Sequence, residues 1–130
     1  MEAIRRDDLE ELTAFYATAY PGTWFVPRML ETGRYVGIRE AGRLVCVAGV
    51  HVCSPTWSVA ALGNVATLPA FRGRGLARGA CAALCRLLLD DGIETIGLNV
   101  RADNEAAIRS YTRLGFESVA EYTEASLAAR

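Results

Sequence analysis

Apolar residues recur three and four positions apart in several parts of the chain, which is the spacing of an amphipathic helix. The longest such stripe begins at Leu76 and ends at Leu88. Gly92 and Gly115 follow two of these stripes and fit the residue after a helix end. Pro21-Gly22 stops an earlier one. Helices are predicted over about residues 8–20, 27–31, 75–91 and 105–114.

Other apolar runs are shorter and are bounded by turn residues, which is typical of strands. The run from residue 44 to residue 50 is apolar on both faces, so it should be a central strand. Ala41-Gly42 supplies a tight turn before it and predicts a hairpin. Strands are predicted over residues 3–5, 35–40, 43–53, 58–67, 95–100 and 116–127.

The length and the element order predict one α/β (α+β) domain over residues 1–130. A chain of 130 residues suits a single domain. The order β-α-α-β-β-β-α-β-α-β predicts a mixed sheet flanked by helices. The net charge of −1 gives no overall electrostatic attraction to nucleic acid or to an anionic membrane. The N-terminus has no apolar signal core and no apolar run approaches a membrane span, so a cytoplasmic protein is expected.

The numbers of lysine, histidine and cysteine residues limit the catalytic and metal-binding groups that the chain can supply. All 14 basic residues are Arg, which excludes a catalytic or Schiff-base lysine. The chain has one His and four Cys, so a metal site is not expected. The cysteines should be reduced and packed as small apolar side chains; they are Cys46, Cys53, Cys81 and Cys85.

The sharpest local signal is a glycine-bearing loop that joins a predicted strand to a predicted helix. Gly73 and Gly75 allow a tight turn and a close approach of the backbone to a ligand. The first amides of the following helix lack internal acceptors and lie at its positive end, which favours phosphate or pyrophosphate. Arg72, Arg74 and Arg78 add positive charge.

Two better-known phosphate loops do not match this one. No Gly-Lys-Ser or Gly-Lys-Thr follows, so it is not a P-loop. The dinucleotide fingerprint needs a third glycine where this chain has Arg78. The alternative interpretation is a glycine-rich turn with solvated arginines.

A second signal lies about thirty residues further on, and the two together resemble the GNAT superfamily of N-acetyltransferases. Arg72-x-x-Gly75-x-Ala77 is similar to that family's acyl-CoA signature. The second stretch resembles the family's Asn-x-x-Ala-x-x-x-Tyr-x-x-x-Gly-Phe helix, at Asn104, Ala107, Tyr111, Gly115 and Phe116. The resemblance covers nearly the whole chain and implies a GNAT-like, largely antiparallel mixed sheet with about four helices. Its C-terminal half looks most like the branch related to glycine N-acyltransferases.

The resemblance implies acyl transfer from acetyl-CoA, or another acyl-CoA, to a primary amine by direct attack. Backbone groups near Val65 and Thr67 should pair with the pantetheine arm, and Asn104 should contact it. Tyr111 should protonate the leaving thiolate, because a phenol suits that task. The amides that should hold the pyrophosphate belong to Arg72, Gly73, Arg74, Gly75, Leu76 and Ala77.

The general base is the main departure from the family pattern. Asn64 and Asn99 stand where many members have a glutamate, and neither side chain can accept a proton from an ammonium. His51 is one candidate base, because its ordinary pKa suits the task. Deprotonation through ordered water and backbone carbonyls is another. A third interpretation is an acyl-CoA-binding or acyl-CoA-sensing domain, or half of a larger two-domain acyltransferase, without efficient turnover.

The acceptor amine, a small molecule or a peptide, should approach from the side opposite the cofactor. Trp24 and Phe25 could form an apolar wall there, and Arg28 could meet a carboxylate. The alternative is a hydrophobic plug over the sheet edge. Cys53 and Trp57 could border the same pocket. Residues 116–127 could also join two copies into a homodimer.

Overall fold

The computed structural model describes residues 2–23, 25, 27–32, 34–100 and 103–118. It divides into two units, residues 1–99 and 100–130, and each is described by itself. Trp24 and residues 119–127 of the last predicted strand lie outside the described part.

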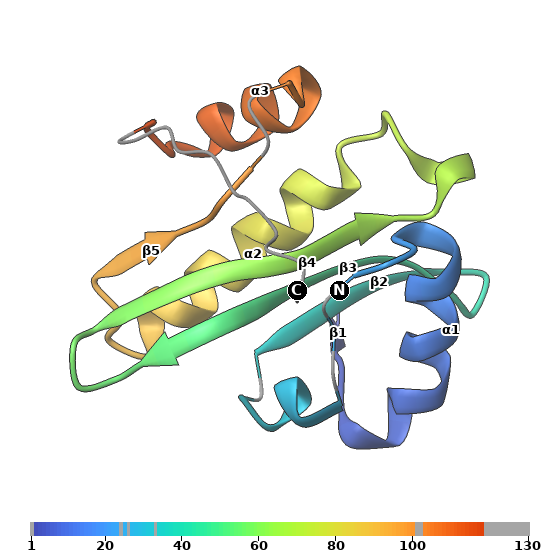
Figure 1. The fold of residues 1–130 in the computed structure, drawn as a ribbon, viewed down its shortest axis with the longest axis horizontal. Coiled ribbons are helices and arrows are strands. Elements are labelled where there is room, and N and C mark those ends of the chain that lie inside the picture. Colours follow the sequence, from blue (N-terminus) through green and yellow to red (C-terminus); the bar gives the residue numbers. More distant parts are fainter. Residues whose placement is uncertain (1, 24, 26, 33, 101–102, 119–130) are drawn as a thin grey trace, which may run out of the picture. The chain divides into compact units, whose positions relative to one another are not determined.

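The first unit is built on a five-stranded sheet (Figure 1) with the strand order β1-β2-β3-β4-β5. Neighbouring strands are antiparallel except for β4 and β5, which are parallel. The mixed, largely antiparallel sheet expected from the sequence is therefore confirmed. The strands are β1 (Glu2–Ala3), β2 (Tyr35–Glu40), β3 (Arg43–Ser54), β4 (Val59–Thr67) and β5 (Thr95–Gly97).

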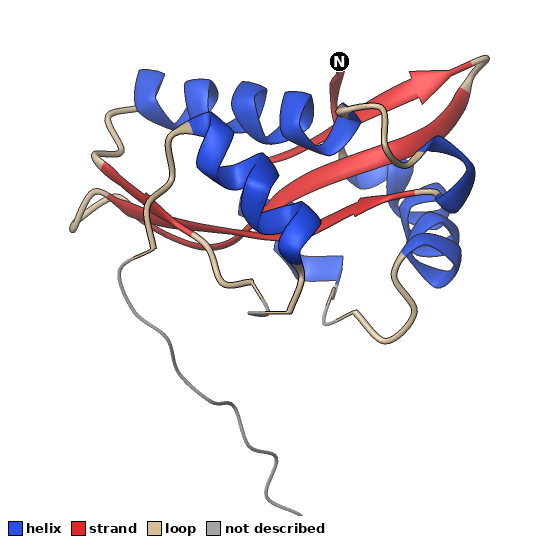
Figure 2. Cartoon of the chain, turned by 90° about the horizontal axis from the view of Figure 1, so that it is seen from above, coloured by secondary structure: helices blue, strands red, loops and turns tan. Residues whose placement is uncertain are grey.

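Helices cover both faces of this sheet. In Figure 1, α1 (Leu9–Ala19) lies in front of the strands and α2 (Leu76–Asp90) lies behind them. Figure 2 shows α2 running along its face of the sheet. Three short 3₁₀ helices complete the unit, η1 (Arg6–Asp8), η2 (Pro27–Thr32) and η3 (Pro69–Phe71). The short helix predicted over 27–31 is thus 3₁₀ rather than α.

The run that is apolar on both faces becomes the central strand β3, as predicted. Val45 and Val47 face the core on the α1 side. Cys46 alternates with them and lies close to Cys81 of α2. All four cysteines are free thiols, and burial raises the pKa of Cys81 to about 12. This buried thiol is therefore neutral and packs as a small apolar side chain.

Glycine ends α2 in the way the sequence predicts. Gly92 has φ +89°, and its amide donates to Leu89 O at 3.0 Å. The next amide, from Ile93, donates to Leu88 O at 3.0 Å. These two bonds form a Schellman motif, in which the left-handed residue costs glycine little. Ile93 is buried, so the motif also anchors the start of the connection to β5.

The described part of the second unit is one short helix, α3 (Glu105–Leu114), with the predicted bounds. The Asn104 side chain accepts from the Ala107 amide at 3.2 Å and caps its start. Gly115, at φ +105°, forms a second Schellman motif, in which the Phe116 amide donates to Tyr111 O at 3.1 Å. The rings of Tyr111 and Phe116 meet edge to face at 6.0 Å, which is the apolar contact of that motif.

Gly49→Ala should destabilise the first unit by about 1–3 kcal/mol, the usual cost of overpacking a core. An added Cβ would lie 2.6 Å from Cδ2 of the buried Tyr35 ring and closer still to two other ring carbons. Gly97→Ala is the matched control in the same sheet, because its Cβ would meet nothing within 4 Å. Urea unfolding measures both. Equal stability of the two variants would contradict the packing described for Tyr35.

Candidate functional site

A tight loop carries the chain from the end of β4 to the start of α2. The Leu68 amide donates to Val45 O at 2.8 Å and holds the loop's first residue against β3. After η3, Gly73 and Gly75 take φ angles of +81° and +77°. L side chains rarely adopt this conformation, so glycine at both positions has a direct physical reason.

The start of α2 leaves backbone amides without acceptors from the helix. Gly79 N–H donates to Gly75 O at 3.1 Å, the first bond of the helix. No side chain caps this end. The amides of Leu76, Ala77 and Arg78 precede that first bond and form a donor group at the positive end of the helix dipole. A phosphate group is the ligand that such a terminus favours.

Arg72 has a structural role in this loop. Its Nε donates to Thr67 O at 3.1 Å, and its Nη2 donates to Ala19 O at 3.0 Å. Thr67 is the last residue of β4, and Ala19 is the last residue of α1. One guanidinium therefore links the end of the strand and the end of the helix to the loop. The Arg72 amide donates to Pro69 O at 3.4 Å, so the backbone and the side chain of this residue both hold the turn in place. Of the amides expected to hold the pyrophosphate, that of Arg72 is therefore already engaged.

Arg74 is also engaged, but at the surface. It makes a two-pronged ion pair with Glu40 of β2, at 3.0 Å and 2.7 Å, and its guanidinium lies 5.6 Å from the Phe71 ring centre. The Arg74 guanidinium holds the pKa of Glu40 below its usual value. The pair is solvent-exposed, so exchanging one anion for another costs little. Arg78 adds positive charge beside Gly75, with its Nη2 3.4 Å from where a Cβ would stand.

One edge of β4 loses its neighbour partway along the strand. β5 pairs with β4 only at three positions, from Val59 to Ala61 (Figure 1). The strand expected over 95–100 is therefore shorter, and β4 has no strand paired on that side from Leu62 onward among the described residues. Val65 and Thr67 lie in this part. The Thr67 hydroxyl lies 3.4 Å from Cys46 Sγ, so its side chain is engaged within the sheet.

A bulge interrupts β4 at Asn64. Val47 to Gly49 of β3 oppose Gly63 to Ala66 of β4, so three steps along β4 match two along β3. Asn64 takes φ +54°, a left-handed conformation that Asn tolerates better than most residues. Regular alternation from 58 to 67 does not predict this kink. An Asn inside an apolar strand is the one signal in the sequence that points to it.

Asn64 is the centre of a hydrogen-bond cluster. The Tyr16 hydroxyl donates to Asn64 O at 2.6 Å, and Thr23 donates to its Oδ1 at 2.8 Å. Its Nδ2 donates to the Tyr35 hydroxyl at 2.9 Å. Burial raises the pKa of Tyr16 and of Tyr35 above the usual range, so both phenols stay neutral. Neither tyrosine belongs to a motif in the sequence, so the sequence alone does not indicate their place at the site.

His51, the candidate base, lies beside this cluster. The pairing of β3 with β4 has a second bulge, in which His51 is the extra residue on β3. The Nε2 atom of His51 lies 3.4 Å from Asn64 Oδ1. Its side chain is exposed, so the imidazole can reach solvent. Cys53 is half-buried on the same strand, and Trp57 is 79% exposed at the turn that follows.

The predicted acceptor residues have different environments. The Phe25 ring packs between Tyr16, at 5.2 Å, and Tyr35, at 5.7 Å. This packing agrees with the alternative interpretation of the sequence, in which the side chain covers the sheet edge and does not line an acceptor pocket. Arg28 is exposed on η2. Asn104 and Tyr111 belong to the second unit, where they cap and close α3 as described above.

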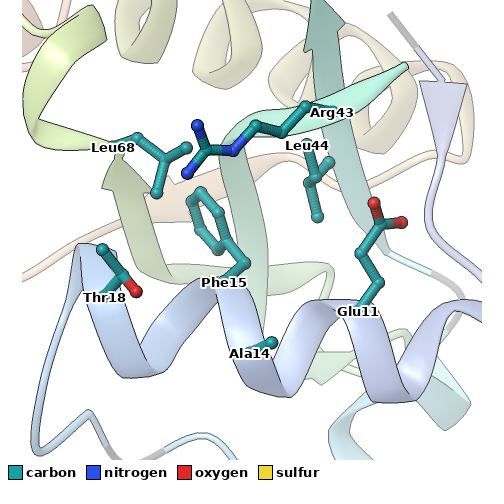
Figure 3. Close-up of a pocket in the computed structure, with 7 residues that line it drawn as sticks. All are labelled: Glu11, Ala14, Phe15, Thr18, Arg43, Leu44 and Leu68. Atoms are coloured by element: carbon teal, nitrogen blue, oxygen red, sulfur yellow. The ribbon is translucent and has the colours of Figure 1, made fainter.

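A cavity of about 240 Å³ is a separate feature of the described residues (Figure 3). It lies between α1 and the neighbouring parts of the sheet, and none of the predicted site residues lines it. Figure 3 shows the Arg43 side chain extending across it toward Phe15 and Leu68. Its lining residues are Glu11, Ala14, Phe15, Thr18, Arg43, Leu44 and Leu68.

The described residues contain neither a cluster of metal ligands nor a membrane-spanning helix. No three His, Cys, Asp or Glu side chains there gather as metal ligands would. None of the helices in that part of the chain is both long enough and apolar enough to cross a membrane.

Comparison with known proteins finds several acetyltransferases that are similar to this chain. The chain is 36% identical over 96 residues to a mycothiol acetyltransferase of Tsukamurella paurometabola, covering 72% of this chain but only 33% of that protein. It is 28% identical over 123 residues to the ribosomal protein bS18 alanine N-acetyltransferase of Haemophilus ducreyi, covering 92% of this chain and 83% of that protein. The crystal structure of the Escherichia coli ribosomal-protein-S18-alanine N-acetyltransferase superposes with a TM-score of 0.74 at 26% identity, covering 92% of this chain and 77% of that one.

The family assignment rests on a longer match. The model of the acetyltransferase (GNAT) family matches residues 1–116, which include the glycine loop, the bulged strand and α3. The chain therefore belongs to the acetyltransferase (GNAT) family.

Proposed function

We propose that this protein transfers an acetyl or other small acyl group from acyl-CoA to a primary amine. The observation that carries the proposal is the group of uncapped amides at the start of α2. The left-handed conformations of Gly73 and Gly75 produce the turn that leads into this helix start. These amides would bind the pyrophosphate of the cofactor. The names of the relatives, which are mycothiol and ribosomal-protein alanine acetyltransferases, support acetyl transfer.

The pantetheine arm would lie along the part of β4 that β5 leaves unpaired. A strand edge presents backbone donors and acceptors at regular spacing, which suits an arm that contains two amides. Val65 and Thr67 lie in that part, and the bulge at Asn64 redirects the strand there. Asn104 would contribute to the same arm, as the family resemblance implies.

The reaction would proceed by direct attack. Bound acyl-CoA supplies an activated thioester carbonyl. The amine nitrogen bonds to the carbonyl carbon, the C–S bond breaks, and Tyr111 gives its proton to the departing thiolate. The nitrogen then loses a proton, and the products are an amide and free CoA. Asn64 cannot take that proton, which leaves His51 or an ordered water as the acceptor.

The acceptor side is proposed to include Trp24, Phe25 and Arg28. The alanine N-acetyltransferases among the relatives make a peptide amine one candidate acceptor. The resemblance of the C-terminal half to the glycine N-acyltransferase branch supports a second candidate, a free amino acid. An assay with both kinds of amine decides between them.

A second candidate function has one observation in its favour. The chain spans only a third of the length of the mycothiol acetyltransferase it matches. Half of a larger two-domain acyltransferase, or an acyl-CoA-sensing domain, would fit that fact and the missing glutamates. Tight binding of acetyl-CoA without turnover of any amine would favour this second function.

Gly75→Val should abolish the stabilisation that acetyl-CoA gives to the protein. Ligand at 100 times its Kd stabilises a folded protein by about 2.7 kcal/mol, which a thermal-shift assay detects. A β-branched residue at φ +77° would strain the backbone where the amides converge. Gly92→Val is the matched control, because it strains the other end of α2 at φ +89°. Loss of the shift in both variants, or in neither, would count against the site.

Glu40→Gln should raise the affinity for acetyl-CoA about 2- to 5-fold at low salt, because exposed ion pairs are worth less than about 1 kcal/mol. The substitution removes a carboxylate that competes with phosphate for Arg74. Calorimetric titration measures the change, which should shrink as salt screens the charges. Glu10→Gln on α1 controls for net charge. Weaker binding by Glu40→Gln would place Arg74 outside the cofactor site.

Tyr111→Phe should lower kcat by about 10²- to 10⁴-fold, the usual contribution of a general acid. Phenylalanine retains the ring contact with Phe116 and removes only the hydroxyl. Phe116→Leu is the control, since it alters the contact and keeps the hydroxyl. Release of free thiol from acetyl-CoA in the presence of an amine measures both variants. An unchanged kcat for Tyr111→Phe would remove that residue from the reaction.

A further inference from the structure

Asn64 connects the bulged strand to the segment between α1 and β2. Its side chain is bonded to Thr23, which follows the end of α1, and to Tyr35, which begins β2. It also lies 3.5 Å from the sulfur of Met29 on η2. One buried amide, only 7% exposed, therefore contacts this segment near its start, its middle and its end.

Little else of regular structure holds this segment in place. Among the described residues between α1 and β2, the only regular element is η2, and short 3₁₀ helices have weak hydrogen-bond geometry. Tyr35 extends the anchoring, because its hydroxyl also lies 3.7 Å from Met29 Sδ. The position of the segment over the sheet thus depends on a few polar contacts and on the packing of Phe25, Met29 and Leu30 against the core.

Two glycines in the sheet leave space for the side chains of this cluster. Gly49 provides the space for the Tyr35 ring, as described above. At Gly63, a Cβ would stand 2.9 Å from His51 Nε2 and closer still to two ring carbons. Two glycines on facing strands therefore let two aromatic side chains lie flat beside Asn64.

Every buried polar side-chain atom in the described part of the chain has a partner, and this cluster is no exception. Its members are neutral: three hydroxyls and one amide, with the imidazole of His51 at its edge. Removing the amide would take one hydrogen-bond partner from the half-buried Thr23 and one from the buried Tyr35, and the loss of such a partner is costly. The segment would then be released from the strand.

We infer that Asn64 is a positioning residue for the amine substrate: through Thr23 and Met29, its side chain fixes the described part of the segment between α1 and β2 against the β4 bulge. This inference rests on the proposed function, in which that segment forms the acceptor side and the opposite edge of β4 receives acyl-CoA. The amide would thus set the spacing between amine and thioester. Its loss should impair use of the amine and leave the binding of acyl-CoA intact.

Asn64→Gly is the most informative variant. Glycine adopts φ +54° without strain, so the bulge is kept while the side chain is lost. The KM for the amine should rise about 10-fold or more, the factor that one lost buried hydrogen bond commonly represents. The Kd for acetyl-CoA should change less than about 2-fold, because the amides of α2 are untouched. An N-terminal-alanine peptide and free glycine serve as the probe amines.

Thr23→Val and Tyr35→Phe test the same inference if Asn64→Gly folds poorly. Each removes one hydroxyl from the cluster and keeps the side-chain shape. Each should raise the amine KM about 3- to 10-fold, and neither should add fully to Asn64→Gly, because residues in one network are coupled. Hydrogen exchange should speed up at residues 22–30 and stay unchanged at residues 76–90 in all three variants.

The outcomes separate this inference from the proposed function. If the wild type fails to bind acetyl-CoA, the proposed function is wrong, and exchange at 22–30 still reports whether Asn64 anchors the segment. If acetyl-CoA binds and is turned over, an amine KM unchanged in Asn64→Gly and Thr23→Val overturns the inference. Equal losses in amine KM and acetyl-CoA affinity also overturn it, because they indicate a general loss of structure.

Discussion

The left-handed backbone at Asn64, inside β4, sets the geometry of the candidate site. At φ +54°, Asn64 inserts an extra residue into β4 and breaks its regular pairing with β3. The kink is maintained because Tyr16 satisfies its carbonyl and Thr23 and Tyr35 satisfy its amide. Strained backbone persists only where its surroundings hold it, and such positions cluster at functional sites.

The site is organised around the second half of β4. Its pairing with β5 ends at Ala61, which leaves one edge unpaired among the described residues. At the end of the strand, Arg72 binds the terminal carbonyls of β4 and α1 and so fixes the loop. The loop then delivers Gly75 to the start of α2, where backbone amides converge. Edge, loop and helix start follow one another within about fifteen residues of chain, and each suits one part of an acyl-CoA molecule.

Local signals in the sequence predicted most of the elements. Strand 35–40 and helix 105–114 have the predicted bounds, because a tight turn ends one and a cap and a glycine bound the other. Long-range contacts set the features that local signals do not predict, such as the length of β5 and the partners of two arginines. The strand expected over 95–100 ends at Gly97, where its pairing with β4 stops. The ion pair of Arg74 with Glu40 joins residues 34 positions apart, and no local pattern indicates it. The same holds for the role of the Arg72 side chain, which the sequence suggested as a positive charge beside the phosphate and not as a link between β4 and α1.

The central claim is that free amides at the start of α2 bind the pyrophosphate of coenzyme A. Amide chemical shifts in a two-dimensional NMR titration test it most directly, with coenzyme A compared against pantetheine, which lacks the phosphates. We predict that coenzyme A moves the signals of Gly73, Gly75, Leu76 and Ala77 most, and that pantetheine leaves them in place. Unmoved signals at these four residues in the presence of bound coenzyme A would contradict the claim.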